Sequence, residues 1–248
     1  MGWKKNGWFI KDGFYPGYLK MNKKILFLGR DCYAVYDPDN PDNACGCYMS
    51  TFIPQYLEGT LGGKSINTAR FHKLLIQIAY GLLNHNAPVP WSDVLDAAYI
   101  CTSGRIFRDV SFAFMNLGKL SHESGVNADW ERIEEAVEFS VKGDNLIMKE
   151  IDLLSPDLII AMNLADNPQK IDYYKNVFGN SIASTQISVN DCAAYRVNLG
   201  GNKTTLLLDC WHFAGRFNEE EYLYQPIVNA LTGLDFWRQD DPSKSQRG

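Results

Sequence analysis

Three side chains that could perform chemistry each come at the end of a short apolar stretch of the sequence: Asp31, Asn116 and His212. A carboxylate can orient water, a carboxamide can read a hydrogen-bonding edge, and an imidazole can donate or accept a proton. Ligand chemistry in open α/β sheets gathers beyond the carboxyl ends of parallel strands. We therefore expect the three to converge on one cleft. Each residue also has an ordinary structural interpretation: Asp31 as a helix cap, Asn116 as a turn residue, and His212 as a core or surface histidine.

The elements that must position these side chains alternate between strand and helix. The last two of four strand-like runs are nearly continuous in apolar residues, which is typical of parallel strands covered on both faces. The four runs are 24–29, 109–116, 157–162 and 204–209. Helical periodicity occupies 68–83, 128–141, 144–154, 168–178 and 219–236. The alternation predicts an α/β fold, a three-layer α/β/α sandwich around a central four-stranded parallel sheet.

Two further regions frame this pattern. Thr185–Val189 and Ala194–Leu199 read as a hairpin at an edge of the sheet. The region 34–66 is rich in Pro, Gly, Asn and Asp, and a structureless loop of that length is usually functional or disordered.

The chain length favours one domain. With 248 residues, 46% of them hydrophobic, the chain can bury a full core. We expect a basic N-terminal arm at 1–22, a single domain at 23–238 and a polar tail at 239–248. Residues 1–30 carry seven Lys or Arg against the single acid Asp12, which suits either a phosphate-contacting arm or a solvated terminus.

Composition limits the class of protein. No apolar run reaches the roughly 20 residues of a membrane helix, and the N-terminus lacks the apolar core of a secretory signal. Six cysteines without disulfide-like spacing fit a reducing cytoplasm. Cys45 and Cys47 alone do not complete a tetrahedral metal site. We expect a cytoplasmic monomer with no metal, no cofactor and no membrane partner. The net charge of −5 argues only weakly against a nucleic-acid partner.

Ordered motifs across 23–216 resemble those of the uracil-DNA glycosylase superfamily. Gly29–Tyr33 (GRDCY) is similar to the family's Gly-Gln-Asp-Pro-Tyr motif, and Phe114–Leu117 (FMNL) is similar to the strand that ends in the base-recognising asparagine. Trp211–Phe213 (WHF) resembles the His-Pro-Ser motif. Glu150–Asp157 resembles the helix-strand element that precedes it.

The resemblance implies a DNA glycosylase that hydrolyses the N-glycosidic bond of a flipped-out pyrimidine and leaves an abasic site. In that family pattern Asp31 positions the water and His212 donates to O2 of the departing base. Asn116 reads the edge of the pyrimidine, and Tyr33 crowds its C5 side. The partner would be single-stranded DNA or a duplex with one base flipped out.

The resemblance also implies contacts to the flanking DNA. Lys119 and Arg216 would contact phosphates, Arg30 would lie at the same interface, and Phe213 or Phe217 would fill the space left by the flipped base. The motifs differ from the family pattern, because Arg30 replaces a glutamine, Cys32 a proline, and Phe213 with Ala214 the Pro-Ser pair.

The sequence does not decide which base would be excised. The tyrosine match at Tyr33 favours uracil, whereas the unusual 34–66 segment suits a larger base, such as a hypermodified cytosine excised from phage DNA in antiviral defence rather than DNA repair. Candidates for the ring that stacks on the base are Tyr36, Tyr48 and Phe52. Two other classes remain: a nucleoside or nucleotide hydrolase, and an inactive nucleic-acid-binding protein of the same fold.

Overall fold

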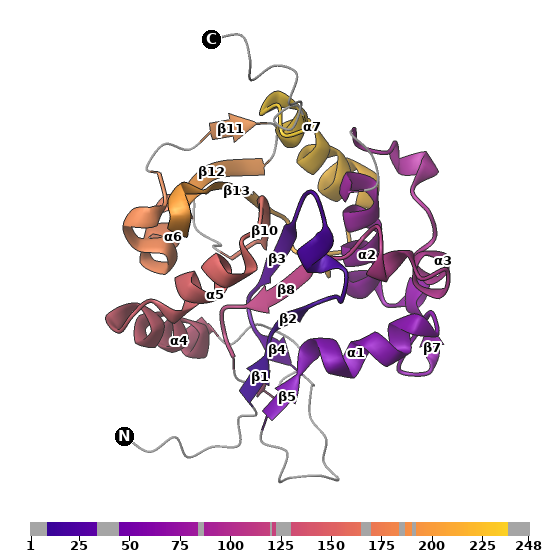
Figure 1. Ribbon diagram of the computed structural model, residues 1–248, viewed down its shortest axis with the longest axis horizontal. Coiled ribbons are helices and arrows are strands. Elements are labelled where there is room, and N and C mark those ends of the chain that lie inside the picture. Colours follow the sequence, from indigo (N-terminus) through magenta and orange to yellow (C-terminus); the bar gives the residue numbers. More distant parts are fainter. Residues whose placement is uncertain are drawn as a thin grey trace.

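The chain folds around a seven-stranded sheet that runs through the middle of the molecule (Figure 1). The structure, a computed structural model, describes residues 9–33, 45–83, 87–119, 121–122, 130–164, 170–183, 187–189 and 192–237. In spatial order the strands are β11 (Ile187–Val189), β12 (Cys192–Asn198), β13 (Thr204–Cys210), β10 (Leu158–Met162), β3 (Ile25–Gly29), β8 (Ala113–Asn116) and β2 (Gly13–Phe14).

The four strands predicted from apolar runs are the parallel centre of this sheet. β3 pairs with β8 and β10, and β10 pairs with β13, all in parallel. The sheet is larger than the four strands expected, because β2 adds to β8 and the predicted edge hairpin, β11 with β12, adds to β13, each antiparallel. β8 is shorter than expected, since it begins at Ala113 rather than at 109.

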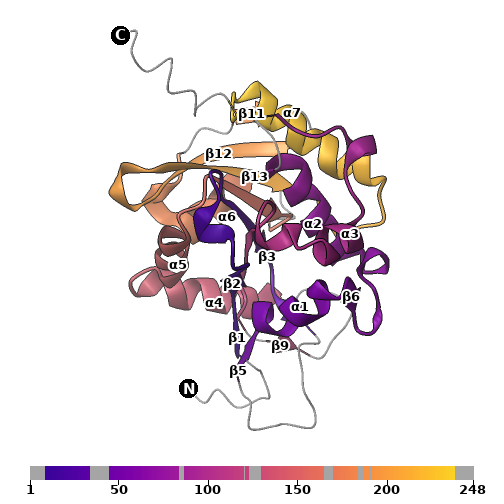
Figure 2. The same ribbon diagram turned by 45° about the vertical axis from the view of Figure 1, so that its right-hand side comes forward.

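Helices cover both faces of the sheet, as Figures 1 and 2 show. One face carries α1 (Tyr48–Leu57), α2 (Arg70–Leu83), α3 (Ala97–Thr102) and α7 (Gln225–Gly233). The other carries α4 (Trp130–Lys142), α5 (Leu146–Leu154) and α6 (Lys170–Phe178). None of the helices in the described ranges is long and apolar enough to cross a bilayer.

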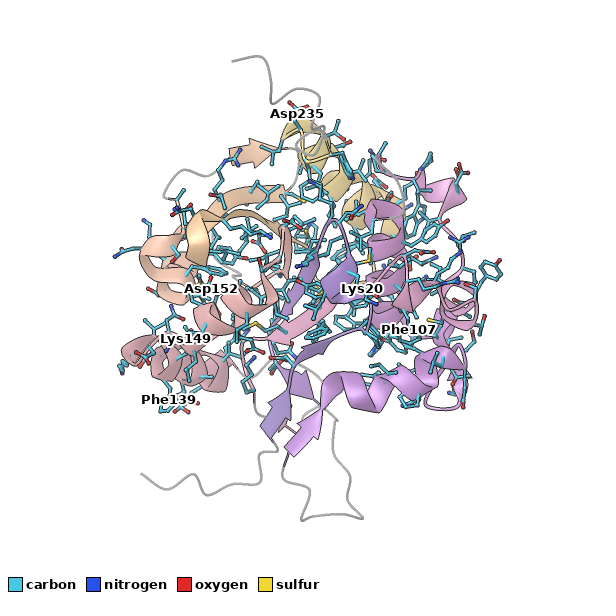
Figure 3. All side chains as sticks on the ribbon, in the orientation of Figure 1. Lys20, Phe107, Phe139, Lys149, Asp152 and Asp235 are labelled. Carbon is cyan, nitrogen blue, oxygen red and sulfur yellow. The ribbon has the colours of Figure 1, made fainter. Side chains whose placement is uncertain are left out.

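Each central strand supplies side chains to both layers because successive residues of a strand point to opposite faces. In β3, Ile25 and Phe27 belong to the core under α2 and α7, and Leu26 and Leu28 belong to the core under α4, α5 and α6. Each core is one cluster of buried hydrophobic residues, and Figure 3 shows side chains in the space between the sheet and the helices. The mixed α/β architecture with helices on both faces is therefore confirmed.

The connections define where a ligand is expected. The chain passes from β3 to β8 through α1, α2 and α3 on one face, and from β8 to β10 through α4 and α5 on the other. The strand order therefore reverses between β3 and β10, and in open α/β sheets ligands bind beyond the carboxyl ends of the strands at such a point.

Two segments differ from expectation. The part of 1–22 that the structure describes is not a free arm, because β2 joins the main sheet and Tyr15 and Tyr18 are fully buried. The region 34–66 is not structureless from residue 45 onward. It contains β5 (Cys45–Cys47), which pairs with β1 (Phe9–Lys11), then α1, and the small hairpin of β6 (Thr60–Leu61) and β7 (Lys64–Ser65).

Candidate active site at the carboxyl ends of the parallel strands

Asn116 and Gly29 lie side by side at the ends of β8 and β3. They are partners in the register of the two strands, and a Cβ atom added to Gly29 would lie 2.3 Å from Oδ1 of Asn116. The carboxamide therefore lies across the Cα of Gly29, a close approach that only glycine permits. Asn116 is deeply placed, with 2% of its surface exposed.

The strand pair continues beyond Asn116 and brings Asp31 beside Gly118. The N–H of Leu117 donates to the carbonyl of Gly29 at 3.1 Å, and the N–H of Gly118 donates to that of Arg30 at 2.7 Å. A Cβ on Gly118 would lie 3.2 Å from the Cβ of Asp31. The same two segments then pair again as β4 (Cys32–Tyr33) and β9 (Ser121–His122). The two glycines thus allow the Asp31 and Asn116 segments to pack closely.

Arg30 crosses the point where the strand order reverses. Its Nε donates to the carbonyl oxygen of Asn163, just after β10, at 2.7 Å. Its guanidinium lies 4.8 Å from the ring centre of Trp130, a cation–π distance. Arg30 therefore ties the end of β3 to the end of β10 and to the start of α4.

His212 faces the same charges from the end of β13. Burial and the Arg30 guanidinium lower the pKa of His212 to about 4, and the Asp31 carboxylate partly opposes them. The imidazole is therefore neutral at pH 7. Its Nδ1 accepts a hydrogen bond from the N–H of Ala214 at 3.2 Å, which places the ring proton on Nε2. His212 can thus offer one neutral N–H donor to a ligand near Asp31.

Phe71, at the start of α2, supplies an aromatic wall. Its ring stacks on the His212 imidazole and meets the ring of Phe114 edge-on. His72 packs edge-on against Phe71 with their ring centres 5.4 Å apart, and Phe52 lies 4.8 Å from His72 between ring centres. These four aromatic side chains from α1, α2 and β8 form a continuous surface that ends at His212.

Arg70 fixes the loop that carries His212. Its guanidinium donates to the carbonyl oxygens of Gly215 and Phe217, both at 2.8 Å, and forms an ion pair with Glu219 at 2.6 Å. Lys73 pairs with the same carboxylate at 2.7 Å. The loop after β13 is therefore held from the neighbouring helix at several points.

Other residues expected at the site lie elsewhere. Phe213 is fully buried against Phe27, so the exposed phenylalanine of this loop is Phe217, at 38%. The side chain of Lys119 forms ion pairs with Asp12 and Glu150, so its charge is balanced within the protein.

The structure describes the side chains of only some of the remaining predicted site residues. Arg216 is exposed. Phe52 packs on His72 and Tyr56. The side chains of Tyr33 and Tyr48 and the whole of Tyr36 lie outside the described part of the structure.

Two residues at the site carry no clear sequence signal. Phe71 is one apolar residue on the periodic face of a helix, indistinguishable by spacing from the core residues that follow it. Arg70 is a charged residue before that face. Their partners, His212 and Glu219, are more than 140 positions further along the chain, so only the fold brings them together.

Within the described ranges no group of three or more His, Cys, Asp or Glu side chains is placed to hold a metal ion. The side chains of Cys45 and Cys47 lie outside those ranges. The groups described at the site are instead those of acid–base and hydrogen-bond chemistry: a carboxylate, a neutral imidazole, a carboxamide and an aromatic ring.

No protein-family model matches the chain, and no curated protein matches it in sequence. The chemistry of the site itself is therefore the basis for a functional assignment.

Proposed function

We propose that this protein is a DNA glycosylase that hydrolyses the N-glycosidic bond of a pyrimidine. The observation that carries the proposal is a neutral His212, with its proton on Nε2, in the electrostatic reach of the Asp31 carboxylate. Cleavage of this bond develops positive charge on the sugar and negative charge on the departing base. An anion beside a neutral donor complements both charges.

Each group has one role in this mechanism. The Asp31 carboxylate orients a water molecule toward C1′ and stabilises the developing sugar cation. The Nε2–H of His212 donates to O2 of the base as that oxygen becomes negative. A neutral donor suits this role because it stabilises the leaving base without needing to be reprotonated after each turnover.

Base recognition is assigned to Asn116 and Phe71. The Asn116 carboxamide has one donor and one acceptor end and can pair with a pyrimidine edge. Its side chain is buried, so a base that contacts it has to be inserted deeply, and this requires a nucleotide taken out of the stack or from a single strand. The ring of Phe71 offers a face against which such a base can lie.

The architecture supports the proposal at the level of fold class. A uracil-DNA glycosylase-like protein is expected to have a parallel four-stranded sheet between helical layers, with its site residues beyond the first, second and fourth of these strands. The chain has such a sheet, and Asp31, Asn116 and His212 occupy those positions.

The test is incubation of the protein with labelled single- and double-stranded oligonucleotides that carry one uracil, followed by alkaline cleavage at abasic sites. A second series carries glucosylated cytosine. Strand scission in either series that disappears in the Asp31→Asn protein supports the proposal. Release of bases from free nucleosides but not from any oligonucleotide would instead identify a small-molecule hydrolase.

The base itself is tested at Tyr33. If its ring occupies the C5 side of the base, uracil is the substrate and Tyr33→Ala gains activity on thymine, because truncation leaves room for the methyl group. Activity on glucosylated cytosine without activity on uracil would place the protein with enzymes that remove hypermodified bases.

A further inference from the structure

We propose that Asp12 is a positioning residue for Asn116, and that it sets the carboxamide in the orientation that reads the base. This inference rests on the proposed function. It is carried by a chain of charged side chains that ends on the backbone of Asn116, in which the side chain of Asp12 is 1% exposed, that of Lys119 20% and that of Glu150 35%.

Asp12 lies where the backbone ladder between β2 and β8 stops. β2 pairs its Gly13 and Phe14 with Phe114 and Ala113 of β8, so this ladder ends two residues before Asn116. Beyond it the side chain of Asp12 continues the contact between the two segments, because its Oδ1 accepts the N–H of Asn116 at 3.0 Å. The Asp12 side chain is 1% exposed, so water does not compete for this bond.

The other oxygen of Asp12 is fixed as well. Its Oδ2 pairs with Nζ of Lys119, which pairs in turn with Oε2 of Glu150 on α5 at 2.8 Å. Removing one partner of such a buried pair is costly, so the network resists rearrangement. A carboxylate that is bound at both oxygens has one orientation. Through its hydrogen bond, Asp12 therefore fixes the position of the Asn116 backbone N–H.

The side chain of Asn116 is also confined on the side that faces β3. Its carboxamide lies across Gly29, where a Cβ would approach within 2.3 Å. The backbone of Asn116 is held by Asp12 and its side chain is bounded by β3, so a small shift at Asp12 moves the carboxamide relative to Asp31 and His212. Misplacement of a recognition group by about 1 Å can reduce the rate about a hundredfold.

Burial raises the pKa of Asp12 to about 7, while Lys119 lowers it and Glu150 raises it. Among the residues that the structure describes, the charged groups that face Asp12 are Lys119, from the segment after β8, and Glu150, from α5. Because the N–H of Asn116 donates to Asp12, we expect a change in the charge of Asp12 to alter the amide resonance of Asn116, a signal that does not depend on turnover.

The experiment compares Asp12→Ala, which removes the acceptor, with Asp12→Asn, which keeps an acceptor oxygen for the Asn116 N–H but removes the charge. Asp144→Asn is the matched control, because the Asp144 side chain is 80% exposed and pairs with Lys149 at the surface. Uracil excision from a single-stranded oligonucleotide is measured as kcat and KM for all four proteins.

We expect Asp12→Ala to lower kcat/KM at least about tenfold, Asp12→Asn to retain it within about threefold, and Asp144→Asn to match the wild type. Unchanged kcat/KM in Asp12→Ala overturns the proposal. Equal losses in Asp12→Ala and Asp12→Asn also overturn it, because the ion pair rather than the bond to Asn116 would then be responsible.

A second measurement covers the case in which Asp12→Ala does not fold, and also the case in which the wild type excises no base. In the wild type, the backbone amide resonance of Asn116 is followed by NMR from pH 5 to 9. A resonance that moves with pH in the wild type and no longer does so in Asp12→Asn supports the coupling. An Asn116 resonance that is the same in the wild type and in Asp12→Asn throughout this range contradicts it. If the wild type excises no base but shows this shift, the glycosylase proposal is refuted and the link between Asp12 and Asn116 is still supported.

Discussion

The ring of Phe71 lies nearly parallel to the imidazole of His212, with their centres 5.7 Å apart and their planes at 21°. One residue begins a helix and the other follows the last parallel strand, so this stack joins two segments that are distant in sequence. The contact fixes the plane of the imidazole, and its Nδ1 bond to Ala214 fixes the rotation within that plane.

Replacement of Phe71 tests the importance of this stack. We expect Phe71→Ala to lower kcat/KM for excision at least about tenfold, because both the plane of His212 and the aromatic face offered to the base are lost. Phe71→Leu keeps the apolar volume and should recover stability more than activity. Phe139→Ala is the control, since Phe139 is 66% exposed on α4 at the outer side of the molecule (Figure 3). Equal activity of Phe71→Ala and the wild type would remove Phe71 from the site.

Substitution of Gly29 tests the close approach to Asn116. Gly29→Ala would force a Cβ against Oδ1 of Asn116, which displaces the carboxamide and costs about 1–3 kcal/mol in folding free energy. We expect excision to fall about tenfold or more and the melting temperature to decrease. In Gly143→Ala the nearest atom is 3.9 Å from the new Cβ, so this protein should behave as the wild type in both assays.

The two catalytic assignments predict loss of chemistry without loss of binding. Asp31→Asn and His212→Ala should each reduce excision by about 10²–10⁴-fold, the usual contribution of a positioned acid, base or charge-stabilising donor. DNA affinity, measured by fluorescence anisotropy with an uncleaved oligonucleotide, should change little. A parallel fall in affinity would show that these residues position the DNA rather than react.

The buried ionisable groups predict the effect of pH on stability. The pKa values of His72 and His212 are lowered from 6.5 to about 4, so at each site the unfolded chain binds a proton between those values and the folded chain does not. The pKa of Asp12 is raised from 3.8 to about 7, which has the opposite sign over the same window. Two protons taken up and one released leave a net uptake of about one proton on unfolding, so stability should fall as pH falls from about 6.5 to 4.

Urea unfolding at pH 7, 6 and 5 measures this dependence. In Asp12→Asn the opposing proton is absent, so the fall in stability per pH unit should become about twice as steep. In His72→Gln it should become shallower. Stability that rises as the solution is acidified would contradict the assigned direction of both histidine shifts.

Arg216 is predicted to contact a phosphate. Its exposed position in the loop after β13 leads us to expect that Arg216→Ala weakens DNA binding equally for different sequences. The slope of log affinity against log salt should fall by about 1, since one phosphate contact is lost. Arg196→Ala, an exposed arginine on β12, should leave the slope unchanged. Equal slopes for Arg216→Ala and the wild type would place the DNA path elsewhere.

The sequence predicts the centre of the fold because that information is local. The apolar runs at 24–29, 157–162 and 204–209 are short and buried on both faces, and they become β3, β10 and β13. The helix stop at Ser155 and Pro156 is also local, and Ser155 adopts the left-handed conformation there. Parallel pairing then brings together the ends of the strands, which is why Asp31, Asn116 and His212 could be proposed as one group.

The residues that the sequence does not reveal depend on packing over long distances. Asp12 is one acid in a basic segment, and only the pairing of β2 with β8 places it beneath Asn116. Lys119 has the charge expected of a phosphate contact, yet two carboxylates from distant segments hold it inside. Phe213 follows the histidine as a DNA-contacting ring would, but its side chain points into the core, where Phe27 meets it.

The pairing of β2 with β8 has a consequence for self-association. β8 carries buried side chains on both faces, and β2 covers the backbone groups along its outer edge. A chain shortened to begin at residue 23 would present this apolar edge unpaired, and such edges recruit strands from other molecules. The segment around Gly13 and Phe14 therefore acts as a cap on the sheet. Its removal should promote the formation of strand-paired aggregates, which light scattering would detect.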